Sequence, residues 1–138
     1  RRGDGVGPRL QTVHSRDGGR SFPRLEPLLG EEPERALRAE PDLALSPLGL
    51  TVAVWRHQEV DEQGRATGEA MLRLAVREGE DGWDGPRALP GCRAERGCRE
   101  PLVALDGSGA AHFLWLEGSP EEGMVLRYQR ASLAPGDE

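Results

Sequence analysis

The chain contains an internal repeat with an offset of 60 residues, and this repeat limits the folds that are open to it. The segment from Glu40 to Trp55, EPDLALSPLGLTVAVW, recurs from Glu100 to Trp115 as EPLVALDGSGAAHFLW, without a gap. Each copy is typical of a strand that starts at proline, a turn, and a second strand that ends at tryptophan. Two copies of one supersecondary unit indicate a repeat architecture.

Further strands are predicted around the two copies from their patterns of apolar and polar residues. Leu72 to Arg77 alternates regularly, and Val125 to Arg130 does so less regularly. Leu10 to His14 takes the same place near the N-terminus, and Gly85 to Leu89 is predicted as an outer strand. Period-two alternation indicates strands rather than helices. The unit therefore has four antiparallel strands.

The second strand of each copy is almost wholly apolar, which is typical of a strand buried on both faces. These strands are Leu50 to Trp55 and Ala110 to Leu116, with His112 as the polar exception and as an expected hydrogen-bonded core histidine. We therefore expect an all-β fold of β-propeller-like four-stranded antiparallel blades. An immunoglobulin-type sandwich predicts two distant cysteines with a tryptophan between them, a pattern this chain does not show.

The octapeptide SRDGGRSF at positions 15 to 22 predicts a tight turn. The carboxylate of an aspartate can accept backbone N–H groups, and glycine tolerates the positive φ angles of such a turn. The spacing resembles the Asp box, or BNR repeat, of the sialidase superfamily, with phenylalanine where tryptophan is commoner. The resemblance implies a structural role, away from any catalytic centre, for Ser15, Asp17, Gly19, Ser21 and Phe22.

The resemblance also implies a domain organisation. Residues 1–138 are expected to form a single sialidase-like propeller fragment of about two and a half blades. Residues 10–29 would be the end of one blade with its Asp box, 40–90 a complete blade, and 100–132 a partial blade, with a linker from 30 to 38. Because a closed propeller needs at least about four blades, the ring is expected to be incomplete.

Sialidases bind the sugar carboxylate with an arginine cluster and use a tyrosine nucleophile, so the resemblance directs attention to these residue types. Arg99 has the spacing to Pro101 of the family's Arg-Ile-Pro motif, and Arg38 lies three residues before Pro41. Both are candidates for contacting an anionic ligand, with a solvated arginine at the rim as the alternative. Tyr128, the only tyrosine, is expected to pack between blades.

Glutamates 40 and 100 occupy the same place in both copies, which favours a role in the repeat over one in a single active site. No residue is therefore assigned to catalysis. Phosphate loops, zincin histidine pairs and nucleophile elbows do not occur in the sequence. We expect no cofactor.

Cys92 and Cys98, the only cysteines, flank a loop that would join two blades. Neighbouring glycines allow the two Cα atoms to come within the ~4.4 to 6.8 Å that a disulfide requires. We therefore expect a disulfide, and a secreted propeller would supply the oxidising compartment. Free thiols or half of a metal site are the alternatives, although the three histidines lack the spacing of zinc ligands.

Composition excludes several partners. The formal net charge is -6, and arginine is interleaved with acidic residues, which argues against nucleic acid. The longest apolar runs are too short to span a bilayer. Lysine, isoleucine and asparagine are absent, which is typical of GC-rich coding and suggests a bacterial source. The first residue is not methionine and no signal segment follows, so we expect a piece of a longer protein.

Two functions from different classes are expected. The first is a non-catalytic binding or structural module of an exported protein, at an extracellular, periplasmic or cell-surface location. Its partners would be carbohydrate or protein, and the remaining propeller blades. The second is part of a sialidase-like exo-glycoside hydrolase acting on sialic-acid-type sugars. The first is preferred because the sequence shows no tyrosine and glutamate pair and no clear arginine motif.

Overall fold

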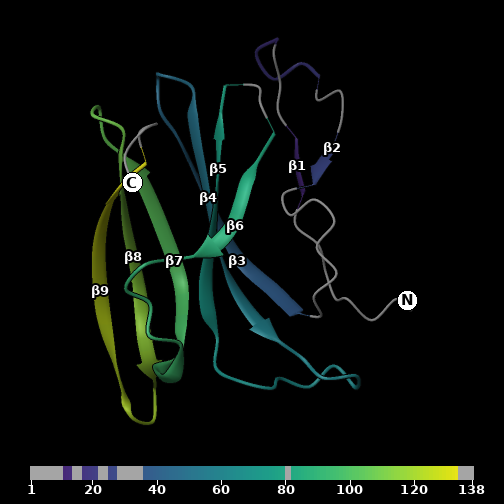
Figure 1. Cartoon of the computed structure of the whole chain (residues 1–138), viewed down its shortest axis with the longest axis vertical. Helices are drawn as coiled ribbons and strands as arrows, with labels where there is room; N and C mark the ends of the chain where they lie inside the picture. The colour runs from purple at the N-terminus through teal and green to yellow at the C-terminus, as the bar shows by residue number, and fades with distance from the viewer. Residues whose placement is uncertain (1–10, 14–16, 22–24, 28–35, 80–81, 134–138) are drawn as a thin grey trace.

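The computed structural model describes residues 11–13, 17–21, 25–27, 36–79 and 82–133. In this part of the chain it is all-β, with three antiparallel sheets and one short 3-10 helix, η1 (Ala94–Arg96). Figure 1 shows the sheets standing side by side in chain order, with the two larger sheets next to each other. No helix in the described ranges is long and apolar enough to cross a membrane.

The first large sheet has four antiparallel strands in sequence order, as the repeat predicts. They are β3 (Ala36–Leu45), β4 (Leu50–Glu59), β5 (Met71–Glu78) and β6 (Asp84–Ala88). The strand β3 begins before the expected end of the linker, because Ala36 is buried and already pairs with Glu59. The first strand of this sheet thus starts inside the segment 30–38 that the sequence predicts as a linker.

The second large sheet repeats the first three strands of this arrangement. Its strands are β7 (Cys98–Leu105), β8 (Ala110–Ser119) and β9 (Gly123–Ser132). The turns between the first two strands of the sheets are also equivalent. Gly49 donates its N–H to the carbonyl of Ser46 at 3.1 Å, and Gly109 does the same to Asp106 at 3.2 Å. Both glycines have φ near +90°, a conformation that few other residues adopt.

The first strand of each large sheet, β3 and β7, is called its inner strand. Each inner strand carries a β-bulge at the same place in the repeat. The register shifts between Ala39 and Asp42 in β3, and between Arg99 and Leu102 in β7. The bulged residues Glu40 and Glu100 have φ angles of 56° and 55°, which are uncommon for a residue with a side chain. A proline follows each of them, and proline has no N–H to contribute to the ladder. The bulge therefore belongs to the repeat.

The main core lies between the two large sheets. Val54 of β4 and Leu74 of β5 belong to it from the first sheet, and Phe113 and Trp115 of β8 from the second. The opposite face of the first sheet is also buried, where Trp55 forms a smaller cluster with Ala53, Ala75 and the partly buried Trp83. The strand β4 is thus buried on both faces, as its apolar sequence predicts. Complete burial of each large apolar side chain contributes about 1.5 to 3 kcal/mol.

The N-terminal sheet pairs β1 (Gln11–Val13) with β2 (Leu25–Pro27). Between them, one oxygen of Asp17 accepts the backbone N–H of Arg20 at 3.1 Å and that of Ser21 at 3.0 Å. The other oxygen accepts the Ser21 hydroxyl at 2.7 Å, and the two intervening glycines have positive φ. Asp17 therefore forms the turn that its spacing predicts. Ser15 and Phe22 lie outside the described residues.

Candidate functional site at the inner strands

The inner strands β3 and β7 are joined by two carboxylates of β3. One oxygen of Glu40 accepts the backbone N–H of Glu100 at 2.7 Å, and one oxygen of Asp42 accepts that of Val103 at 2.9 Å. Glu100 is the bulged residue of β7, and Val103 lies further along the same strand, which is the edge of its sheet. The carboxylates of the neighbouring sheet therefore satisfy N–H groups that an edge strand would leave unpaired. Hydrogen bonds to an ionised acceptor are among the stronger ones in proteins.

Glu40 also lies beside a cation. Its second oxygen lies 3.5 Å from Nη1 of Arg56, on β4 of the same sheet. The carboxylate thus contacts a guanidinium of the first sheet and a backbone amide of the second. This confirms a structural contact for Glu40, as its recurrence predicts. Glu40 is the bulged residue of β3, and its side chain reaches across to the neighbouring strand β7.

Arg38 is buried in the first sheet rather than solvated at a rim. It pairs in register with His57, which is also buried. Because alternate residues of a strand share a face, Arg38 and His57 lie on the face of Trp55, turned away from the second sheet. The rim position considered for Arg38 is therefore wrong, since this part of the sheet is covered.

Arg99 lies on the second sheet, where it is half-buried and pairs in register with Leu116. Its Nε atom is buried and has no hydrogen-bond partner among the described residues. Arg38 and Arg99 are also not equivalents in the repeat, because the offset of 60 residues aligns Arg99 with Ala39. The described structure does not bring the two candidate arginines together into one cluster.

A linked group of polar side chains on the second sheet was not recognised from the sequence. The ring of His112 contacts Asp106 through Nε2 at 2.8 Å and the Tyr128 hydroxyl through Nδ1 at 2.7 Å. The rings of His112 and Tyr128 are stacked with centroids 5.9 Å apart. Hydrogen bonds from the hydroxyl of Ser108 and from His112 hold the pKa of the Asp106 carboxyl well below its usual range.

This group bears on two expectations. His112 is hydrogen-bonded as expected but only half-buried, and Tyr128 is exposed in the described part of the chain. When Nε2 of His112 donates to Asp106, Nδ1 can accept a hydrogen bond from the Tyr128 hydroxyl, which orients that hydroxyl. The hydroxyl is paired with a histidine, however, whereas a sialidase nucleophile is assisted by a glutamate. The pair depends on the register of the two strands, in which Tyr128 lies opposite Leu114, two residues from His112 on the same face.

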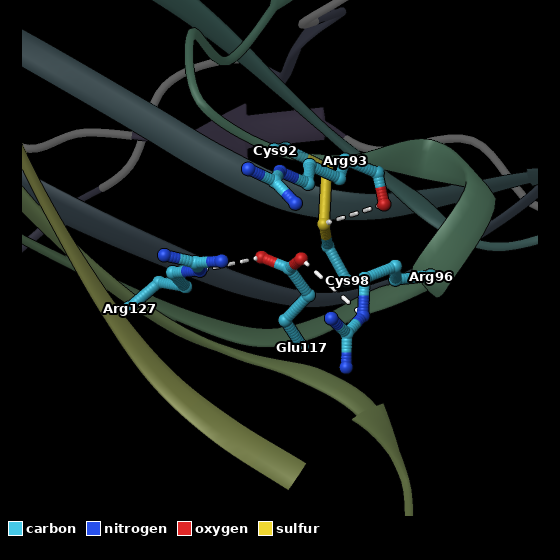
Figure 2. The surroundings of a disulfide bond; sticks show 6 residues. All are labelled: Cys92, Arg93, Arg96, Cys98, Glu117 and Arg127. Atoms are coloured by element: carbon cyan, nitrogen blue, oxygen red, sulfur yellow. Dashed lines mark hydrogen bonds and ion pairs between the residues drawn. A yellow bond between two sulfur atoms is a disulfide. The ribbon is translucent and has the colours of Figure 1, made fainter. Parts of the chain in front are cut away.

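A disulfide and a buried carboxylate lie together at the start of the second sheet (Figure 2). Cys92 and Cys98 are bonded, with their Cα atoms 6.3 Å apart, which confirms the expected disulfide. Glu117 is fully buried and pairs in register with Cys98. Its two oxygens lie 2.9 Å from Nε of Arg127 and 3.7 Å from Nε of Arg96. The only sequence signal for Glu117 is a charge that directly follows an apolar strand.

Within the described ranges, no group of three or more histidine, cysteine, aspartate or glutamate side chains could hold a metal ion. No protein-family model, curated protein or solved structure matches the chain. The function is therefore inferred from the repeat itself, from the contacts between its two copies, and from the chemistry of the side chains described above.

Proposed function

We propose that this chain is a segment of an Asp-box β-propeller of an exported protein, and that it is a non-catalytic structural or binding module. The observation that supports this proposal is the pair of hydrogen bonds from Glu40 and Asp42 to the backbone of β7. The carboxylates of β3 that face the neighbouring unit hold that unit in place. Carboxylates with this role are poor candidates for acid, base or nucleophile.

The arrangement of the arginines supports the same proposal. Recognition of a sugar carboxylate by sialidases requires several guanidinium groups that converge on one point. Arg38 lies on the face of the first sheet that is turned away from β7, whereas Arg99 lies on β7 itself. Arg56 lies beside Glu40. These three arginines therefore face different surroundings and do not converge on one point.

The disulfide supports an exported location. Disulfides persist in oxidising compartments and are rare in the reducing cytosol. We therefore propose an extracellular, periplasmic or cell-surface protein. Its nearest partners would be further blades of the same propeller, and its ligand would be a carbohydrate or a protein.

The alternative function, a part of a sialidase-like exo-glycosidase, is favoured by one observation only. The Nε of Arg99 is buried without a hydrogen-bond partner among the described residues, and a ligand carboxylate could provide one. Arg99 is also the residue with the spacing of the family's arginine motif. It is therefore the best residue with which to separate the two functions.

The test is an assay of the full chain with a fluorogenic sialic acid glycoside. We expect no release of the fluorophore above the background of buffer alone. The variants are Arg99→Ala and, as a matched control, Arg87→Ala, which removes an exposed arginine of β6. Turnover that is retained in the Arg87 variant and lost in the Arg99 variant would establish the glycosidase function and overturn the proposal.

A further inference from the structure

One face of the second large sheet is uncovered among the described residues. In β8, Phe113 and Trp115 point into the core between the sheets, so the alternate residues of that strand point the other way. The register of β7 and β9 places further residues on that side. We call this surface the free face. It includes Leu102, His112, Leu114, Leu116, Leu126 and Tyr128, and the register also places Arg99, Ala104 and Arg130 on this side.

The free face is the counterpart of the covered face of the first sheet. The repeat offset aligns Leu114 with Val54, and their neighbours on the third strands are Tyr128 and Leu74. Val54 and Leu74 are 0% and 1% exposed, because β7 to β9 cover them. Leu114 and Tyr128 are 37% and 57% exposed. The same positions are thus core in one unit and surface in the next.

The contact that joins the inner strands also has a counterpart. Glu40 holds the N–H of Glu100, and Glu100 stands on an equivalent bulge with an equivalent φ. Glu100 is exposed, and its carboxylate has no partner among the described residues. The second contact does not recur, because Leu102 occupies the place of Asp42. The second sheet thus keeps one of the two acceptors and has an exposed leucine in place of the other.

The two arginines of the free face, Arg99 and Arg130, have long apolar stems that can pack on a covering sheet while their guanidinium groups reach its edges. The histidine and the tyrosine hydroxyl would not prevent burial either. Both ring nitrogens of His112 are already hydrogen-bonded, to Asp106 and to the Tyr128 hydroxyl. Burial of a polar group is costly chiefly when it lacks a hydrogen-bond partner. Covering the leucines around this pair would stabilise the assembly, because it removes their apolar area from water.

We propose that the free face is the docking surface for one further copy of this repeat unit, and that Glu100 accepts the backbone N–H of that unit's bulged residue. The inference rests on the proposed function as a propeller segment. The occupant is a blade of this type because the same interface, with the same glutamate, already joins the two described units. Its inner strand would lie beside β7 as β7 lies beside β3.

The test supplies such a unit in a tandem chain, in which residues 79–133 are repeated after Ser132. The junction follows the structure, because Glu78 and Ser132 both pair with the first residue of the second strand in their sheets. The tyrosine of the added copy is replaced by phenylalanine, so that Tyr128 of the original copy alone reports on the free face. Thermal unfolding and hydroxyl-radical footprinting are compared with those of the 138-residue chain.

We expect Tyr128 to lose reactivity at least several-fold in the tandem chain. Glu100→Ala should leave the Tm of the 138-residue chain unchanged and lower that of the tandem chain by several degrees. Glu40→Ala is the positive control, because it should lower the Tm of both chains. A tandem chain in which Tyr128 stays reactive, including one whose added unit does not fold, overturns the proposal. Equal effects of Glu100→Ala in the two chains also overturn it.

Sedimentation of the 138-residue chain tests the other occupant of the free face. A dimer that Leu114→Glu converts to monomer would assign the surface to a second copy of the whole chain and overturn the proposal. A monomer is the expected result. These outcomes are independent of the glycoside assay. A blade can dock on the free face in a chain that shows no turnover, and a chain that shows turnover can fail to dock a blade, so the failure of one proposal is distinguished from the failure of the other.

Discussion

The carboxylate of Glu40 accepts the backbone N–H of Glu100, the residue that occupies the same place 60 positions later in the repeat. The contact is made possible by the bulge, which withdraws Glu100 from the ladder of its own sheet and presents its N–H to the preceding one. Side-chain acceptors on one inner strand thus complete the hydrogen bonding of the next. Four predictions about stability and pH dependence follow from the contacts described above.

The first prediction concerns the joint between β3 and β7. Glu40→Ala and Asp42→Ala should each lower the free energy of unfolding by about 1.5 to 3 kcal/mol, because each leaves a backbone N–H of β7 without its charged acceptor. Urea denaturation followed by tryptophan fluorescence measures the loss. Glu62→Ala, in an exposed loop, is the control and should change stability by less than about 0.5 kcal/mol. Equal stability of Glu40→Ala and the control would contradict the assignment.

The second prediction concerns the buried Glu117. Arg127→Ala should be among the most destabilising substitutions in the chain, at about 3 to 5 kcal/mol, because it leaves the fully buried Glu117 carboxylate without its hydrogen-bonded partner. Glu117→Ala should cost less, because the two arginines that it leaves unpaired are partly exposed to water. Arg127→Ala should cost more than Arg96→Ala, since Arg127 is at hydrogen-bond distance and Arg96 is at 3.7 Å. Equilibrium unfolding of the three variants gives the order. The reverse order of the two arginine variants would disprove the role assigned to Arg127.

The third prediction is a pH dependence that originates at Asp106. Its pKa is lowered in the folded chain relative to the ordinary value of 3.8, owing to hydrogen bonds from Ser108 and His112. The carboxylate therefore stabilises the fold fully above about pH 4, and this contribution decreases as the pH falls below that value. Unfolding curves between pH 2 and pH 6 should show a shallower acid loss for Asp106→Asn than for the parent chain. Parallel curves would rule out this contribution.

The fourth prediction concerns the disulfide. Replacing both Cys92 and Cys98 by serine should lower the free energy of unfolding by about 2 kcal/mol, the value expected for closing so short a loop. Thermal unfolding with and without reductant gives the same comparison in the parent chain. The reductant should lower the Tm of the parent and leave that of the double variant unchanged. A mass of the untreated protein without the 2 Da deficit of one disulfide would show that the thiols are free.

The strands could be predicted from the sequence because their pattern is local. The repeat of Glu40 to Trp55 aligned the two units correctly, and the alternation after it located the third strands. The turn at Asp17 followed from the spacing of one carboxylate and two glycines. Each of these features depends on residues close together in the chain, or on a direct comparison of the two copies.

The contacts between sheets could not be predicted in the same way. The left-handed conformation of Glu40 and Glu100 is unusual for glutamate, so no propensity would indicate it. Tyr128 was expected between blades because it lies in a third strand, but its burial depends on a neighbouring sheet that the pattern of the strand does not reveal. Glu117 was overlooked because its two arginines lie on either side of it in the sequence, at positions 96 and 127, and only the fold brings both guanidinium groups to its carboxylate.

The hydrogen bond between the bulges has a direction along the chain. The acceptor belongs to the earlier strand, β3, and the donor belongs to the later strand, β7. During synthesis from the N-terminus, the carboxylates of β3 leave the ribosome before the amides they will bind. A unit that has already folded can therefore serve as a template on which the next inner strand is positioned as it emerges.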